Sequence, residues 1–402
     1  MSTHSTLPVS VVTICNHKGG TGKTTSSVHL AAAIGHSGRR VLVIDFDPQG
    51  FLTRTLGLKE PTVEASSLAL LDADADLRTF PVESVSGFDV IGSSMGLTRA
   101  LRRLTKPTDV FWLRETLAAG HDYDLILLDT AAALSVFTMN ALVACDQVVI
   151  PVTPEYQPVV GAEQTWQTSR LVKSKLNPSL MAPRFLLTQV DARLRRHSSY
   201  AEYLREKYGP AVMQTAIRTS SSLATATRDG RTVYDARVTT RGAVDYACAA
   251  EEIGVALFDT PTPRPLLRTL PSGDLTIIDL HAEDVGRRVD AIPEASPAPD
   301  APQPASPVSQ SAPRITSAPD ASPAPPRSGD VPVIRRNPLP SDSNAAAAAD
   351  MLAQARTLAE QPPEAPAPGD FALAAAPLGT PDAEGDGAEG TSREGWTSLD
   401  QI

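Results

Sequence analysis

Short, almost unbroken apolar runs alternate with longer segments of mixed apolar and polar residues over the first 260 residues. Runs of valine, isoleucine and leucine with few polar interruptions are typical of strands buried on both faces of a parallel sheet. On this basis we predict strands at 9–15, 40–47, 88–94, 123–130, 147–153 and 184–190. The segments between them predict helices, of which the clearest are 24–38, 109–120, 161–177 and 240–258.

This alternation of strand and helix predicts an α/β fold, a doubly wound and mostly parallel sheet with helices on both faces. We expect a short arm at 1–8 and a single folded domain at 9–260, which is a usual size for an α/β domain. Ligands of such sheets bind outside the carboxyl ends of the strands. The loops that follow the predicted strands are therefore the places to look for chemistry.

The remaining segment, 261–402, has a different composition. It carries 10 Lys and Arg against 20 Asp and Glu, whereas 1–260 carries 26 of each, and it holds 24 of the 35 prolines. Such a segment cannot bury enough apolar surface to offset the entropy lost on ordering, so we predict a largely disordered acidic tail. Within it, 344–361 could form a short helix, and 393–402 could be a docking motif for a partner.

The cysteines and the apolar runs indicate a compartment. Three scattered cysteines fit neither a disulfide framework nor a metal-ligand spacing, which favours a reducing environment. The sequence has no basic-then-apolar leader and no apolar run of about 18 residues. We therefore expect a soluble, cytoplasmic protein with no membrane partner.

Glycines follow the first predicted strand and open the first predicted helix, in the run NHKGGTGKTT at 16–25. This run almost fits the phosphate-loop pattern G-x-x-x-x-G-K-[ST], in which glycines let backbone N–H groups approach phosphate oxygens. Gly22, Lys23 and Thr24 are in their expected places, but His17 stands where the first glycine should be. We expect Lys23 to reach the outer phosphates and Thr24 to offer its hydroxyl to Mg²⁺.

Three aspartates close two of the predicted strands. Asp129 ends 123–130, where phosphate-loop enzymes place an aspartate that supports magnesium. Asp45 and Asp47 end 40–47, and residues two apart on a strand share a face. One of these two could position an attacking water while the other holds magnesium waters or neighbouring backbone. Each could alternatively do no more than cap its strand.

Together these motifs resemble the deviant Walker A loop and following motifs of ParA/MinD-type ATPases. The resemblance rests on K-G-G-T-G-K-T at 18–24, D-F-D-P-Q-G at 45–50 and the segment 123–156, and it continues through 186–193 and 240–253. The D-P-Q-G element favours the ParA branch. The resemblance implies a P-loop NTPase fold of the SIMIBI type, with ATP as substrate and Mg²⁺ as cofactor. The ATP-binding residues that it implies are Lys18, Gly19, Gly20, Thr21, Gly22, Lys23, Thr24 and Thr25.

In this family two ATP-bound subunits face each other, and the early lysine crosses to the partner's phosphates. The resemblance therefore implies a homodimer formed on ATP binding, in which Lys18 acts in trans. It also accounts for His17, because the first Walker glycine is absent throughout the family. The catalytic candidates are Lys18, Lys23 and Asp47, with Asp47 orienting the hydrolytic water. The magnesium candidates are Thr24, Asp45 and Asp129.

One loop departs from the family pattern. The family usually has two prolines in the second switch loop, where Ala131 and Ala132 stand here. Alanine leaves this loop more conformational freedom, which bears on the hydrolysis rate and its coupling to a partner rather than on nucleotide binding. The first predicted strand starts near residue 9, so the chain resembles the short ParA class, for which operator-specific self-repression is not expected.

A basic stretch at 191–241 holds ten Lys and Arg against five Asp and Glu. ParA dimers typically bind DNA without sequence preference, and arginine can hold phosphate oxygens bidentately. The stretch could alternatively be a solvated face or be paired within the molecule. The DNA-binding candidates are Arg193, Arg195, Arg196, Arg218, Arg228, Arg231 and Arg241. The acidic tail could compete with DNA for this patch.

The resemblance thus predicts a nucleoid-associated partitioning ATPase that segregates chromosome or plasmid DNA, with hydrolysis stimulated by a ParB-like adaptor. Positioning of a protein cargo and an ATP-gated scaffold with little hydrolysis stay open as alternatives. A MinD-like membrane role would need a basic amphipathic helix at the C-terminus, whereas this tail is acidic and has no lysine. Lys18 together with D-P-Q-G disfavours a metabolic enzyme of the same fold.

Overall fold

An eight-stranded sheet forms the centre of the protein in a computed structural model that describes residues 10–236, 238–258, 264–270, 272–278, 342–360 and 366. The strand order is β3-β4-β2-β5-β1-β6-β7-β8, and every pair is parallel except β3 with β4. The strands are β1 (Ser10–Ile14), β2 (Val41–Asp45), β3 (Glu83–Val85), β4 (Phe88–Ile91), β5 (Leu125–Asp129), β6 (Gln147–Val152), β7 (Arg184–Val190) and β8 (Val212–Arg218).

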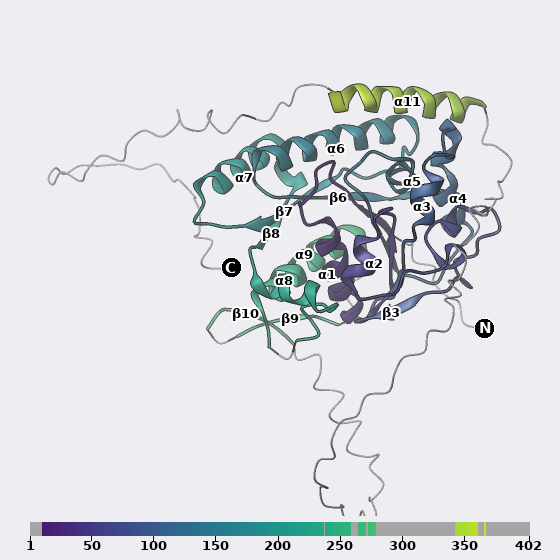
Figure 1. The fold of residues 1–402 in the computed structure, drawn as a ribbon. Coiled ribbons are helices and arrows are strands. Elements are labelled where there is room, and N and C mark those ends of the chain that lie inside the picture. Colours follow the sequence, from purple (N-terminus) through teal and green to yellow (C-terminus); the bar gives the residue numbers. More distant parts are fainter. Residues whose placement is uncertain are drawn as a thin grey trace, which may run out of the picture. The chain divides into compact units, whose positions relative to one another are not determined.

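Helices cover both faces of this sheet (Figure 1). The longer ones are α1 (Lys23–His36), α4 (Trp112–Ala118), α5 (Val136–Ala144), α6 (Tyr156–Lys175), α7 (Arg195–Tyr208), α8 (Ser221–Arg228) and α9 (Arg241–Leu257). Shorter pieces are α2 (Phe51–Thr55), α3 (Gly96–Ala100) and the 3₁₀ turns η1 (Val63–Ala65), η2 (Ala69–Leu71), η3 (Pro107–Val110) and η4 (Gly209–Ala211). The prediction of a doubly wound, mostly parallel α/β sheet is confirmed.

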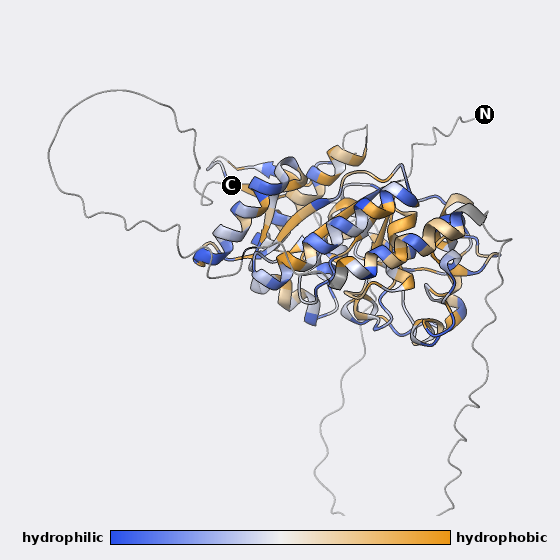
Figure 2. Cartoon of the chain, turned by 90° about the horizontal axis from the view of Figure 1, so that it is seen from above, coloured by the Kyte–Doolittle hydropathy of each residue, from blue (hydrophilic) through white to orange (hydrophobic). Residues whose placement is uncertain are grey.

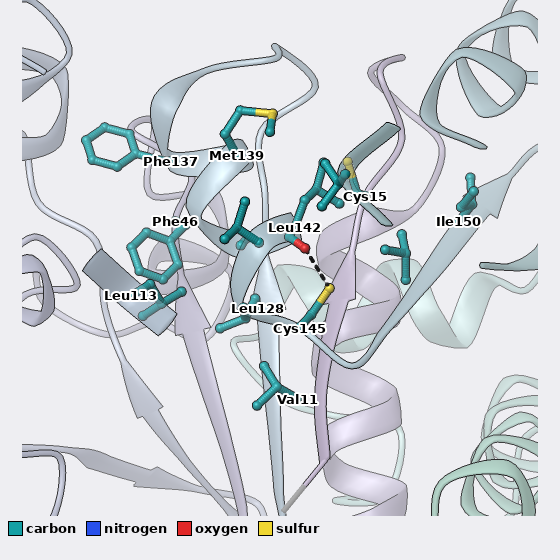
Figure 3. Close-up of a cluster of buried hydrophobic side chains, with 14 of the residues drawn as sticks. Val11, Cys15, Phe46, Leu113, Leu128, Phe137, Met139, Leu142, Cys145 and Ile150 are labelled. Carbon is teal, nitrogen blue, oxygen red and sulfur yellow. Dashed lines mark hydrogen bonds between the residues drawn. The ribbon is translucent and has the colours of Figure 1, made fainter. Parts of the chain in front are cut away.

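Two apolar layers hold the sheet between the helices. One layer joins α4, α5, α6 and α7 to the sheet, and the other joins α1 and α9 to its opposite face. Figure 3 shows the first layer, where Phe46, Leu128 and Phe137 pack near the buried Cys15 and Cys145. β2, β5 and β6 are buried along their whole length, and Figure 2 shows strands inside the fold in the colour of hydrophobic residues. This burial is why their sequences read as unbroken apolar runs.

Two described elements lie within the segment predicted to be a tail. A hairpin of β9 (Leu267–Thr269) and β10 (Leu275–Ile277) packs against α9, and helix α11 (Asp342–Glu360) packs against α6 and η3. The helix predicted at 344–361 is thereby confirmed. The disorder predicted for the rest of 261–402 and the docking motif at 393–402 lie outside the described residues. Within the described ranges, no helix is long and apolar enough to span a membrane.

Candidate nucleotide site

The loop between β1 and α1 lies at the carboxyl edge of the sheet, in the middle of the strand order. β1 pairs with β5 on one side and with β6 on the other. The chain builds the sheet first on the β5 side and then, from β6 onward, on the opposite side. In open α/β sheets, ligands bind at the point where the order of strands changes direction in this way. The predicted phosphate loop therefore sits where the fold favours a ligand.

The glycines of this loop face open space. A Cβ atom added at Gly19 or Gly20 would meet no protein atom within 4 Å, so packing inside the protein does not require glycine there. Gly20 and Gly22 have φ values of +78° and +81°, in the left-handed region that favours glycine. Such a turn presents successive backbone N–H groups to a concave surface that suits an anion. The unfilled space over these glycines fits a phosphate group.

The start of the loop is fastened to β6 and α6. The Asn16 side chain is fully buried; its Nδ2 donates to the Pro151 carbonyl at 2.8 Å, and its Oδ1 accepts the Lys18 N–H at 2.9 Å. α6 passes so close that a Cβ atom at Gly161 would lie 2.7 Å from Asn16 Oδ1 and 2.8 Å from Lys18 Cβ. Gly161 is therefore required for the loop to take this position. No pattern in the sequence indicates this role.

The end of β7 fastens the middle of the loop. Thr188 Oγ1 donates to the Thr21 carbonyl at 2.8 Å, and Gln189 Nε2 donates to the Gly20 carbonyl at 2.7 Å. Gln189 has a φ of +54°, which is costly for a residue with a Cβ and is typical of functional sites. The segment 186–193 entered the sequence analysis only as part of the resemblance. Its position at the end of a predicted strand was the one signal for this role.

Lys23 is a buried ammonium group at the start of α1. Its side chain is 8% exposed, and its Nζ donates to the Lys18 carbonyl at 2.9 Å. Burial lowers the pKa of Lys23, while the nearby Cys15, Asp129 and Asp47 act in the opposite direction. A phosphate oxygen in the open space beside this loop would be a stronger partner for the ammonium group than a neutral carbonyl. The geometry thus fits the predicted role of Lys23.

Asp129 joins the end of β5 to the first turn of α1. It accepts hydrogen bonds from Thr24 Oγ1 at 2.9 Å and from Ser27 Oγ at 2.8 Å. Burial, and then the neighbouring Asp45, raise the pKa of Asp129 to about 7, because both disfavour its charged form. A cation next to this carboxyl group would reverse that effect. The arrangement fits magnesium.

The donor set also fits the way that magnesium binds in proteins. Among the described residues there is no group of three or more His, Cys, Asp and Glu that could hold a metal ion. Magnesium usually keeps several waters and binds through one or two protein groups plus substrate phosphates. Thr24 could supply its hydroxyl, and Asp129 could accept hydrogen bonds from bound water.

Asp45 and Asp47 are held in different ways. Asp45 Oδ2 accepts from the Thr53 N–H at 3.0 Å and from Thr53 Oγ1 at 2.7 Å, and Asp45 Oδ1 accepts from the Asp47 N–H at 3.1 Å. Asp45 therefore holds neighbouring backbone, one of the two roles left open from the sequence. Asp47 Oδ1 accepts the Gln49 N–H at 2.8 Å. Within the described part of the chain, its second oxygen has no donor, which leaves it available to a water.

The sequence of this chain is similar to known proteins over the same region. A family model described as an AAA domain matches residues 9–182. The sporulation initiation inhibitor protein Soj of Bacillus subtilis is 37% identical over 248 residues, which are 60% of this chain and 97% of that protein. The chromosome-partitioning ATPase Soj of Thermus thermophilus is 36% identical over 247 residues, 60% of this chain and 94% of that protein. The chain belongs to the ParA/Soj family of partitioning ATPases.

Solved structures agree with this fold. Cobyrinic acid a,c-diamide synthase from Mycobacterium smegmatis, with bound ADP and magnesium, matches 64% of this chain and 99% of its own with a TM-score of 0.53 and 25% identity. A plasmid partition protein from Borrelia burgdorferi bound to AMPPNP matches 62% of this chain and 100% of its own with a TM-score of 0.53 and 22% identity. The predicted resemblance to ParA-type ATPases and the prediction of an ATPase are both confirmed.

The candidate DNA-binding arginines fall into two groups. Four are in ion pairs: Arg193 with Asp191, Arg196 with Glu155, Arg218 with Asp245, and Arg228 with Asp229. Three others, exposed and without an ion pair among the described residues, are Arg195, Arg231 and Arg241. Arg218 differs most from the rest, because two of its nitrogens bind a carboxylate that is itself 5% exposed. That pairing leaves it least available to DNA.

Proposed function

We propose that this ATPase binds ATP with Mg²⁺ in the loop between β1 and α1, and that the ATP-bound form is a dimer that binds DNA without sequence preference. A ParB-like adaptor stimulates hydrolysis and releases the dimer from DNA. This cycle segregates chromosome or plasmid DNA in the cytoplasm, on the nucleoid. The nucleotide part of the proposal is supported by the loop from Gly19 to Gly22 beside the buried Lys23. In this loop Gly20 and Gly22 have positive φ values, and the space at Gly19 and Gly20 is open.

In this proposal the residues of the loop and the aspartates at the ends of β2 and β5 have different tasks. Backbone N–H groups and Lys23 hold the phosphates, and Thr24 holds magnesium with the help of Asp129. Magnesium neutralises charge that develops on the phosphate oxygens during hydrolysis. Asp47 orients the attacking water through its unpaired oxygen, and Asp45 keeps the Asp47 backbone in place.

The proposed dimer explains the position of Lys18. Its side chain is exposed and has no hydrogen bond or ion pair among the described residues, whereas its backbone groups are bound to Asn16 and Lys23. A lysine whose main chain is fixed and whose side chain is free is suited to reach across to a second subunit. A cation placed there would offset phosphate charge in the transition state, as an arginine finger does.

The alternative of a metabolic enzyme would need an acceptor pocket next to the phosphates. The described residues line, among other cavities, one of about 350 Å³ and one of about 200 Å³. The first is lined by residues between Val63 and Pro81, and the second by residues of α7, β8, α9 and β10, and neither includes a residue of the phosphate loop. Neither of these two cavities is therefore the acceptor pocket that a metabolic enzyme would need.

Binding of random-sequence duplex DNA, measured with ATP and with ADP over a series of salt concentrations, tests the proposal. We expect binding with ATP that is lost with ADP, and an affinity that falls steeply with salt because bound arginines release counterions. ATP hydrolysis should be measured in parallel. No DNA binding in either state would refute the DNA part of the proposal, for DNA cargo and protein cargo alike. ATP-gated binding with negligible turnover would favour the scaffold.

A further inference from the structure

Helix α11 is docked on the domain through one apolar face. Ala348, Met351 and Ala355 are at most 1% exposed, and their spacing of three and four residues puts them on one side of the helix. They join the apolar layer that α4, α5, α6 and α7 form with the sheet, and α11 contacts α6 and η3. Figure 1 shows α11 alongside α6. An ion pair between Lys175 and Asp350 adds to this contact.

The chain beyond α11 returns to the domain at α7. Tyr200 Oη donates to the Pro366 carbonyl at 3.0 Å. Tyr200 is four residues after Arg196 in α7, so the two side chains share a face of that helix and lie one turn apart. Arg195, which has no ion pair among the described residues, is the first residue of the same helix. Pro366 is therefore held on the face of α7 that carries Arg196, about one helical turn away, whereas Arg195 projects roughly 140° around the same helix.

Negative charge is concentrated directly after this point. Residues 367–402 contain seven Asp and Glu and one Arg, a net charge of −6 over 36 residues. The segment that connects β10 to α11, 279–341, contains eight Asp and Glu and six Arg, a net charge of −2 over 63 residues. The segment 342–366, which includes α11, has a net charge of −3 over 25 residues, so most of the negative charge of the tail lies from α11 onward.

The distances allow contact. Asp370 is the first of the seven acidic residues and lies four residues beyond Pro366, so an extended chain can carry it up to about 13 Å from that point. One turn of helix, about 5.4 Å, separates Tyr200 from Arg196. Asp370 is the one acidic residue on so short a tether. The other six lie at 382–400, 16 to 34 residues beyond Pro366, and a tether of that length still gives an effective concentration in the millimolar range.

We propose that residues 367–402 occupy the arginines at the start of α7 as an intramolecular competitor of DNA phosphates, and that α11 anchors them there. The inference rests on the proposed binding of DNA. Soj of Bacillus subtilis is matched over 97% of its own length by 248 residues of this chain, which leaves it no counterpart of so long a tail. The competitor is therefore an addition to the partitioning domain, and it lowers DNA affinity until it is displaced.

The test compares DNA affinity among full-length variants in the ATP state. In the first, all seven Asp and Glu of 367–402 become Asn and Gln. The matched control changes seven of the eight acidic residues of 279–341 in the same way. A third variant, Met351→Asp, undocks α11 and leaves the tail sequence intact; circular dichroism and ATP turnover check that its domain is folded.

We expect the first variant to bind random-sequence DNA about tenfold more tightly at low salt, with the difference shrinking as salt screens the charges. The DNA affinity of the control should stay within about twofold of wild type. The affinity of Met351→Asp should lie between those of the control and the first variant, because undocking α11 lengthens the tether and lowers the effective concentration of the acidic groups. Equal affinity of the first variant and the control would overturn the proposal, since general repulsion by acidic chain segments would then suffice.

A second readout does not depend on DNA. Cysteines introduced as Ser199→Cys, next to Tyr200 on the side of α7 toward Arg195, and Gly369→Cys should form a disulfide on mild oxidation, and both the neutralised tail and Met351→Asp should reduce its yield. No disulfide, or an equal yield in all backgrounds, would refute the contact. If the disulfide forms as expected but no variant binds DNA, the proposed DNA binding is refuted, whereas the proposed contact between 367–402 and α7 is supported.

Discussion

The phosphate loop is held by hydrogen bonds between mostly neutral groups, whereas two arginines near the start of α7, Arg193 and Arg196, are held by ion pairs at the surface. Asn16, within the loop, donates to the Pro151 carbonyl of β6, whereas Thr188 and Gln189 reach the loop from the end of β7. Each of these bonds is between 2.7 and 2.9 Å long. Arg193 is paired with Asp191, but its side chain is 88% exposed. Surface ion pairs of this kind add little to stability and exchange readily.

This difference indicates that the two regions meet their ligands in different ways. The phosphate loop has its backbone arranged before a nucleotide arrives, so binding energy is not spent on ordering it. The candidate DNA-binding arginines, here called the arginine face, include residues that must instead exchange a carboxylate partner for phosphate. The affinity of this face for DNA therefore depends on salt and on competing acidic groups. Variants that remove one positive charge from each region separate these two modes.

The largest effect is expected for Lys23→Ala. Removing a preorganised cation from a buried site should lower the rate of ATP hydrolysis by about a thousandfold, because removal of one transition-state donor typically costs 10²–10³. Arg195→Ala removes the same charge from the surface and should leave hydrolysis measured without DNA within about twofold. Phosphate release at saturating ATP provides the measurement. A similar loss in both variants would contradict the distinction between the two regions.

A second effect concerns pH and stability in the nucleotide-free protein. Burial raises the pKa of Asp45 to about 6, and burial together with Asp45 raises that of Asp129 to about 7. Both are above the unfolded value, so the stability that they contribute is complete below about pH 4 and is lost as pH rises through 6 and 7. We expect the free energy of unfolding to fall by a few kcal/mol over this range.

Asp129→Asn isolates this contribution. The amide cannot ionise, so the difference in unfolding free energy between variant and wild type should change by roughly 2 kcal/mol from pH 5 to pH 8 in favour of the variant. Urea denaturation at intervals of half a pH unit measures it. Parallel stability profiles of the two proteins would show that Asp129 is ionised throughout and would contradict the prediction.

Gly161→Ala tests whether α6 sets the position of the phosphate loop. The added Cβ atom would lie 2.7 Å from Asn16 Oδ1, so the loop must shift, which we expect to lower nucleotide affinity ten- to fiftyfold and stability by about 1–3 kcal/mol. Gly254→Ala in α9 is the matched control. Its Cβ atom meets only Phe258 at 3.8 Å, so the better helix propensity of alanine should make this variant as stable as wild type or more so. Equal nucleotide affinities would show that the loop tolerates the shift.

The sequence predicted the central sheet and the contiguous part of the site. β2, β5 and β6 are buried on both faces, and their composition alone distinguishes them from neighbouring segments. The residues from Lys18 to Thr25 follow one another along the chain, and their spacing therefore carries the chemistry without knowledge of the fold. Edge elements such as β8 and the helix α7 lack such a signal.

The supporting contacts could not be predicted because they join residues far apart in the chain. Gly161 meets Asn16 across 145 positions, and Gln189 meets Gly20 across 169, so no local pattern indicates either pair. The bonds from Thr53 to Asp45, which distinguish Asp45 from Asp47, likewise have no counterpart in a local pattern. The sequence indicated the helix α11, but it did not indicate the apolar layer on which that helix packs.

The smallest effect is expected within the arginine face, between Arg195 and Arg218. Arg195→Ala should weaken DNA binding about three- to tenfold at every sequence and reduce the salt slope by about 1, because one phosphate contact is lost. Arg218→Ala should change DNA affinity less than twofold, because this guanidinium group already binds Asp245 at 2.6 Å. It should instead lower stability by about 1–3 kcal/mol, since the buried Asp245 carboxylate loses its partner. A salt series of DNA binding and a urea titration on both variants provide the measurement. Loss of DNA affinity in Arg218→Ala without loss of stability would show that this pair opens to bind DNA.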